Sequence, residues 1–250
     1  MDVRAYLDRI SYHGLLAPNA DALRVLHRQH LLTVPFENLD IGFGREIVLD
    51  PERFLEKIVT RRRGGFCYEL NGAFAALLTA LGFRVTLLSA RVADEKGVAG
   101  KEFDHLTLRV DLEEPWLADV GFGDNFLEPL RLASGSDQQD AAGGFRLLDA
   151  GERWHLERRH QDGSWRPQYD FSLQPRRLAE FVSMCHYHQT SPESHFTRNR
   201  ICSLATPDGR VTLSGMRLIV TSNGRREERA LASEADWRSA LRDRFGIVLD

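Results

Sequence analysis

The sequence predicts an α+β protein in which helices come first, strands follow, and a mixed α/β tail closes the chain. Up to about residue 83, apolar residues recur every three to four positions, which is typical of helices. From there to about residue 173 they alternate in short stretches bounded by turn-forming residues, which is typical of strands. Because helices and strands are grouped and not interleaved one by one, this order favours α+β over repeated βαβ units.

Four helices are predicted in the first part from the spacing of their apolar side chains. Pro35 ends the second helix, and Asp50 followed by Pro51 is a start signal for the third, since a side-chain cap precedes a proline in the first turn. Gly82 stands where a left-handed C-cap ends the fourth. The approximate ranges are 3–10, 19 or 21 to 34, 50–59 and 67–81.

Short strands with tight turns between them predict an antiparallel sheet or barrel in the second part. The turns are Asp149 to Gly151 and Gln161 to Gly163. The predicted strands are 85–92, 105–110, 116–120, 145–148, 154–158 and 165–171. In the tail we expect a helix around 178–184, hairpins at 207–209 and 223–224, and a last helix from 233 or 234 to about 244.

Composition narrows the class of protein. The formal charge is −3, from 33 basic and 36 acidic residues. The chain therefore lacks the basic surface that favours binding to nucleic acid, and nucleic acid is not expected as a partner. Three widely spaced cysteines cannot form a disulfide framework and fit a reducing compartment. The first twenty residues carry charges throughout, and no apolar run is long enough to span a bilayer. We therefore expect a cytoplasmic protein without a membrane partner.

Cys67 is the candidate nucleophile because a glycine pair delivers it to the first turn of the fourth helix. Unpaired backbone N–H groups and the positive end of the helix dipole stabilise a thiolate at such a place, and the same groups could hold an oxyanion. A free cysteine is more often simply a buried apolar residue, so the functional interpretation needs partners. Cys185 and Cys202 have no comparable setting.

His105 and Asp119 are the candidate partners, a histidine that starts an apolar strand and an aspartate at the end of the next one. A carboxylate inside an apolar strand must be paired or its burial is costly. If residues 112–114 form a three-residue hairpin loop, both side chains lie on the same face, whereas a two-residue loop puts them on opposite faces. The longer loop gives a Cys-His-Asp triad. Glu128, Glu193 and Asp104 compete as the acid, but only Asp119 has the strand context.

Four segments together resemble the arylamine N-acetyltransferases over nearly the whole chain. They are VPFENL at 34–39, RGGFCYELN at 63–71, DVGFG at 119–123 and SPESHF at 191–196. The resemblance implies a papain-like cysteine-triad fold with Cys67, His105 and Asp119 as the triad. It further implies an N-terminal helical bundle at 1–83 that carries the nucleophile, a central antiparallel β-barrel at 84–173 that carries His105 and Asp119, and a C-terminal α/β lid at 174–250.

Members of this family move an acetyl group from acetyl-coenzyme A, through a thioester on the cysteine, to the nitrogen of an arylamine, arylhydrazine or arylhydroxylamine. The resemblance therefore implies acetyl-coenzyme A as the donor and an aryl amine or hydrazine as the acceptor. Phe36 and Phe122 match positions of the family's aromatic acceptor pocket, although such rings are also ordinary core residues. The region after Gly97 has no phosphate-binding signature, so no coenzyme-contact residue is assigned.

Other functions remain open. The segment DNFLEP at 124–129 is closer to related amide synthases, which join an aryl amine to an acyl thioester held by an acyl carrier protein. The chain stops soon after Phe245 to Leu249, from which we expect a trimmed rim of the coenzyme cleft. A papain-like or transglutaminase-like hydrolase and a non-catalytic binding domain are weaker alternatives. Cys185 to His188 lacks the spacing of a zinc half-site, so no metal is expected.

Overall fold

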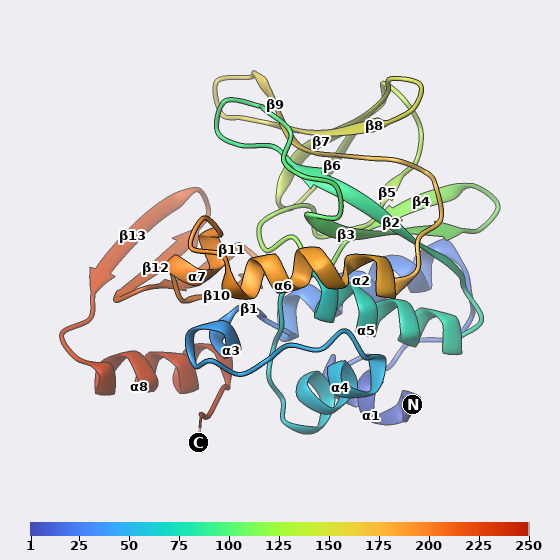
Figure 1. Cartoon of the computed structure of the whole chain (residues 1–250). Coiled ribbons are helices and arrows are strands. Elements are labelled where there is room, and N and C mark those ends of the chain that lie inside the picture. The colour runs from blue at the N-terminus through green and yellow to red at the C-terminus, as the bar shows by residue number, and fades with distance from the viewer. Residues whose placement is uncertain (250) are drawn as a thin grey trace.

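Helices make up the first part of the chain in the computed structural model, which describes residues 1–249 (Figure 1). They are α1 (Val3–Arg9), α2 (Ala20–Thr33), α3 (Leu39–Gly42), α4 (Pro51–Leu55), a turn of π-helix η1 (Glu56–Thr60), and α5 (Cys67–Ala80). The side chains of Asp2, Asn19 and Asp50 cap α1, α2 and α4. α5 is buried along most of its length, so the other helices pack around it.

An eight-stranded antiparallel sheet forms the second part and curls into a nearly closed barrel. Its strands are β2 (Arg84–Val92), β3 (His105–Asp111), β4 (Pro115–Ala118), β5 (Leu130–Arg131), β6 (Asp137–Asp140), β7 (Gly143–Asp149), β8 (Trp154–Arg159) and β9 (Trp165–Phe171). The order is β5-β4-β3-β2-β9-β8-β7-β6. The two edges meet where the Gln138 side chain accepts from the Arg131 N–H and donates to its carbonyl, at 2.8 and 3.0 Å.

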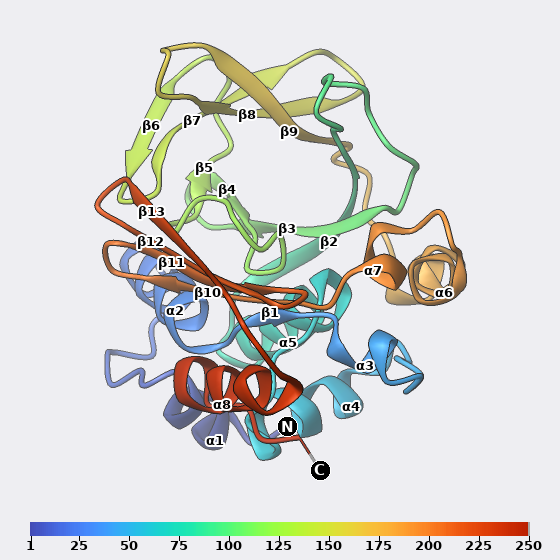
Figure 2. The same ribbon diagram turned by 90° about the vertical axis from the view of Figure 1, so that its left-hand side faces the viewer.

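A second antiparallel sheet of five strands joins both ends of the chain. It consists of β1 (Phe36–Glu37), β10 (Ile201–Thr206), β11 (Gly209–Ser214), β12 (Arg217–Ser222) and β13 (Arg225–Ala230), in the order β1-β10-β11-β12-β13. Helix α8 (Glu234–Phe245) packs on it through Trp237, Leu241 and Phe245. Figure 2 shows this sheet between the barrel and α8.

The segment between the two sheets is helical and comprises η2 (Leu178–Phe181), α6 (Val182–Thr190) and α7 (His195–Arg198). In Figure 1, α6 crosses the front of the molecule, and Figure 2 shows that it lies at its outer side. It contacts both the barrel and the N-terminal part, because His188 binds the turn before β3 while Gln189 binds the backbone of Ile47. α6 therefore connects the halves of the molecule that carry the candidate nucleophile and the candidate base.

The α+β class, the four N-terminal helices and the six strands predicted for the barrel are confirmed. One strand is shorter than predicted, since β4 ends at Ala118 and the chain leaves the sheet before Val120. Among residues 1–249 no helix is long and apolar enough to cross a membrane. The division of the chain at residues 83 and 173 and the cytoplasmic location stay predictions.

Candidate active site

The backbone that delivers Cys67 lies against β1. The N–H of Glu37 donates to the carbonyl of Gly65 at 2.8 Å, so the loop before the cysteine extends the strand contacts of β1. A Cβ atom at Gly64 would lie 2.0 Å from the carbonyl oxygen of Pro35, which no side chain tolerates. Glycine is therefore required for the loop to pass this closely, and the chain then enters α5 at Cys67, which is buried.

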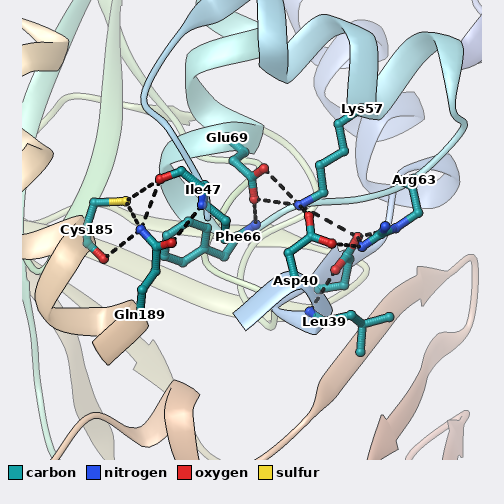
Figure 3. A network of polar contacts seen from close by, with 10 residues as sticks. Leu39, Asp40, Ile47, Lys57, Arg63, Phe66, Glu69, Cys185 and Gln189 are labelled. Carbon is teal, nitrogen blue, oxygen red and sulfur yellow. Dashed lines mark hydrogen bonds and ion pairs between the residues drawn. The ribbon is translucent and has the colours of Figure 1, made fainter. Parts of the chain in front are cut away.

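A network of buried charged side chains holds the loop before Cys67 and the start of α5 (Figure 3). The Glu69 carboxylate accepts the Phe66 N–H at 3.1 Å and pairs with Lys57 at 2.8 Å. Lys57 also pairs with Asp40 at 2.7 Å, which in turn pairs with Arg63 at 3.0 Å. The complete network consists of Glu37, Asp40, Lys57, Arg63 and Glu69. It fixes the loop through Arg63 at its start and through the Phe66 N–H at its end.

His105 and Asp119 lie together, 2.7 Å apart between Nε2 and Oδ2. Asp111 pairs with Pro115 across the hairpin, so the three-residue loop that the sequence required is present and both side chains share one face. The imidazole uses Nε2 for the carboxylate, which leaves Nδ1 as its other proton-carrying atom. Both residues are buried, so the interaction takes place away from water.

The Asp119 carboxylate is held in its charged form. Burial alone would raise its pKa, but His105, the Asn71 amide at 2.9 Å and the Gly121 N–H at 3.0 Å together lower the pKa below the usual value. Gly121 also brings this turn against the nucleophile, because a Cβ there would lie 2.9 Å from the Cα of Cys67. The acid therefore stays ionised beside the imidazole.

Asn71 takes the place of a missing strand residue. The pairing between β3 and β4 stops at Leu108 and Ala118, which leaves the backbone of Leu106 without a strand partner on that side. The Asn71 amide fills the gap by donating to the Leu106 carbonyl at 2.6 Å and accepting the Val120 N–H at 2.9 Å. One turn of α5 thus locks the candidate acid to the strand of the candidate base.

The environment of the Cys67 sulfur differs from the expectation for a helix start. Burial raises the pKa of the thiol well above its usual value, and the Leu106 N–H acts in the opposite direction as a hydrogen-bond donor to the sulfur. Cys185, Asp104 and Asp119 raise this pKa further. Burial therefore opposes the thiolate that the helix start favours, and a lowered thiol pKa, which requires a partner besides the helix start, stays a prediction.

His27 supports the acid from α2. Its Nδ1 lies 2.9 Å from the carbonyl of Leu127 and its Nε2 accepts the Asp119 N–H at 3.0 Å. These partners require the neutral tautomer with the proton on Nδ1. Burial lowers the pKa of His27, which is consistent with a neutral ring. His27 thus fixes the backbone of Asp119, just as Asn71 fixes its side chain.

Aromatic rings surround the imidazole. Phe122 stands edge-to-face on His105 with ring centroids 5.4 Å apart, and Tyr169 lies 5.3 Å from both rings. Phe36 packs on Phe196 at 6.1 Å, and its ring also lies against Gly123, whose built Cβ would be 3.5 Å away. The two phenylalanines predicted for the acceptor pocket therefore meet at one short loop next to the candidate base, Phe122 within the loop and Phe36 against it.

A cavity of about 990 Å³ opens beside this loop, between the barrel and the β11–β12 hairpin. Arginines there could bind phosphate groups. The charged lining consists of Asp124, Asp140, Arg158, Arg159, Asp162, Arg166, Asp208 and Arg210. Arginines and aspartates are equal in number, so charge alone does not mark this cavity as a coenzyme site. Among residues 1–249 no three histidines, cysteines or acids gather as metal ligands.

Comparison with known proteins decides the family. The family model described as N-acetyltransferase matches residues 19–250. An arylamine N-acetyltransferase of Escherichia coli K12 is 38% identical over 249 residues, which cover 98% of this chain and 88% of that protein. The chain belongs to the arylamine N-acetyltransferase family. The family is one of acyltransferases, so the chain is an enzyme of that class.

Solved structures of arylamine N-acetyltransferases share the whole fold. The Salmonella typhimurium protein has a TM-score of 0.94 at 35% identity, with 99% of this chain and 92% of that chain covered. The Mycobacterium marinum protein in complex with CoA has a TM-score of 0.91 at 36% identity, with 98% and 93% covered. The papain-like arrangement predicted from the resemblance is thereby confirmed at the level of the fold.

Within this arylamine N-acetyltransferase fold, His105 of β3 and Asp119 of the turn after β4 are in contact, and the same turn lies against Cys67 at the start of α5. The triad of Cys67, His105 and Asp119 stays a prediction. Sequence reasoning missed the supporting residues Asn71 and His27. Asn71 carried a usable signal, because it lies one helical turn after Cys67 and so faces the same side of α5. His27 carried none, since its partners are about a hundred residues away along the chain.

Proposed function

We propose that Cys67 takes an acetyl group from acetyl-coenzyme A as a thioester and passes it to the nitrogen of an arylamine, arylhydrazine or arylhydroxylamine. The observation that carries this proposal is the buried His105–Asp119 pair at 2.7 Å, locked by Asn71 to the helix that Cys67 begins. The names of the relatives support the choice of donor and acceptor.

In the first step His105 removes the proton of the Cys67 thiol, and the sulfur attacks the carbonyl carbon of the acetyl thioester. The bond from that carbon to the coenzyme sulfur then breaks, and the imidazolium returns the proton to the departing thiolate. Proton transfer to His105 is needed because burial raises the thiol pKa. Asp119 stabilises the imidazolium that forms, since its own pKa is lowered and it stays charged.

In the second step the amine nitrogen attacks the carbonyl carbon of the Cys67 thioester. His105 takes the surplus proton of the nitrogen and gives it to the Cys67 sulfur as the carbon–sulfur bond breaks. The free thiol is thereby restored and an amide is released. Phe36 and Phe122 suit a flat aromatic acceptor by stacking.

Intact mass after mixing with acetyl-coenzyme A tests the donor and the nucleophile together. We expect one acetyl adduct, located on Cys67 by peptide mapping and removed by an aryl amine. Cys67→Ala should give no adduct, whereas the matched variants Cys185→Ala and Cys202→Ala should give the wild-type result. An adduct in Cys67→Ala would refute the assignment.

Asp119→Asn should lose most of the turnover, because the charge that holds the imidazolium is removed.

The amide-synthase alternative depends on the segment at 124–129 and predicts a different donor. The relatives reported above are arylamine N-acetyltransferases, so they lend it no support. The same mass experiment separates the two functions. If acetyl-coenzyme A leaves Cys67 unmodified while a bulky acyl thioester on a carrier protein modifies it, the alternative replaces the proposal.

A further inference from the structure

The turn before the candidate base has an unusual backbone. Phe103 has a φ of +65°, in the left-handed region that residues other than glycine seldom adopt and that costs free energy to hold. Its N–H donates to the Ser89 Oγ at 2.8 Å, and its carbonyl accepts from the Tyr68 hydroxyl at 2.8 Å. The strained turn is therefore held by side chains from β2 and from the residue next to Cys67.

His188 of α6 holds the following peptide group, which joins Asp104 to His105. The His188 Nε2 lies 3.2 Å from the carbonyl oxygen of Asp104 and 3.2 Å from its Oδ1. That carbonyl belongs to the peptide group whose nitrogen is the backbone N of His105. A rotation of this peptide would turn the first residue of β3 and thus its imidazole. The Tyr68 hydroxyl reaches the same carbonyl at 3.4 Å.

His188 is buried, and other contacts fix its ring. Its Nδ1 lies 3.4 Å from the Oγ of Ser194, the residue that caps α7. The Phe196 ring stands edge-to-face on it at 5.2 Å, and this phenylalanine also contacts Phe66, the residue before the nucleophile, at 6.0 Å. His188 therefore joins the turn before the base to the rings behind the nucleophile.

The reaction proposed above does not use this second histidine–aspartate pair. A packing role alone would be served by an apolar side chain of similar size, whereas the buried His188 has polar partners at both ring nitrogens. We propose that His188 is a positioning residue for His105, which it orients by holding the Asp104–His105 peptide group. This inference rests on the proposed role of His105 as the base.

Three variants test it by the rate at which iodoacetamide alkylates Cys67 and by the rate of its acetylation. His188→Leu keeps the bulk and removes the donor, so we expect both rates to fall about tenfold or more. His188→Gln places a side-chain N–H donor close to the position of Nε2 and should restore most of the loss. His186→Leu, at an exposed position of the same helix, is the matched control and should behave like the wild type.

The pH profile of alkylation separates positioning from loss of fold. We expect the pH profile of alkylation in His188→Leu to move toward that of His105→Gln. The melting temperature of His188→Leu should stay close to that of His188→Gln, which shows that the fold is kept. The inference is overturned if His188→Leu reacts at the wild-type rate, or if His188→Gln loses as much as His188→Leu. If alkylation is slow in His105→Gln and normal in His188→Leu, only this inference fails. If His105→Gln itself reacts normally, the proposed function fails with it.

Discussion

At the scale of single residues, the Asn71 side chain makes three hydrogen bonds, and a carboxylate of the same shape cannot reproduce the two in which the amide is the donor. In Asn71→Asp, an oxygen replaces the N–H donor that faces the Leu106 carbonyl at 2.6 Å and the Asp119 Oδ1 at 2.9 Å. Two buried carboxylates then repel each other, and the acid shifts away from His105. We expect kcat to fall on the order of a hundredfold, since orientation of the base is lost.

Steady-state kinetics with an aryl amine measure this effect, and a thermal melt shows whether the fold remains. The same exchange at an exposed turn, Asn223→Asp, supplies the control and should leave kcat unchanged. Wild-type turnover in Asn71→Asp would mean that Asp119 does not need this clamp.

The pH dependence of Cys67 follows from the direction of its pKa shift. Burial raises the pKa of the thiol, so without the imidazole the reactive thiolate forms only above the ordinary value of about 8.5. In His105→Gln, alkylation by iodoacetamide should therefore continue to increase well above pH 8.5. The wild type should react at lower pH, because His105 accepts the proton. Superimposable profiles would show that the histidine does not take part.

At the scale of elements, the buried charges below α5 hold the loop that carries the nucleophile. Lys57→Met would leave the carboxylates of Glu69 and Asp40 without their shared cation. Breaking a buried pair by removing one partner costs about 3–5 kcal/mol. For a chain of this length each kcal/mol lowers the melting temperature by roughly 2–4 °C, so we expect a drop of about 10 °C.

Differential scanning calorimetry measures this drop. Arg61→Met removes an exposed ion pair near the same loop and should change the melting temperature little, since exposed pairs contribute about 0–1 kcal/mol. Equal effects of the two substitutions would contradict a stabilising role of the buried network.

Elements whose pattern is local could be predicted, and those that depend on distant partners could not. The helix after Gly65 and the hairpin of β3 and β4 follow from spacing. Whether the hairpin loop has two or three residues did not, and the meeting of His105 and Asp119 depends on the three-residue loop that the structure shows. β1 has two residues and exists only because β10 pairs with it. β6 reads as the polar run DQQD, which no strand pattern identifies. Burial, which raises the pKa of the Cys67 thiol, could not be predicted either, because a sequence does not show it.

At the scale of the whole molecule, Asp124 links the barrel, the β11 hairpin and the loop that carries Phe122. Its carboxylate lies 3.2 Å from Arg158 on β8 and 3.4 Å from Arg210 on β11. Asp124→Ala would leave the largely buried Arg210 without this partner. We expect a loss of about 1 kcal/mol in stability, because Asp124 is largely exposed, and a higher KM for the aryl amine, because the loop loses its anchor.

Urea unfolding and acceptor kinetics together measure the two effects. Asp162→Ala, which removes an exposed pair with Arg166 at the rim of the same cavity, is the control. A wild-type KM in Asp124→Ala would show that the acceptor pocket does not depend on this link.

The position of β1 determines when the site can be completed during synthesis. β1 pairs with β10 on one side, Phe36 opposite Ser203, and touches the Gly65 loop on the other. A ribosome releases the N-terminal part first, so helix α5 can form long before β10 has emerged. Until then the loop before Cys67 lacks the strand that backs it. We expect the cysteine of an unfinished chain to react like that of an unstructured peptide, so that it captures no acyl group before a pocket for the acceptor exists.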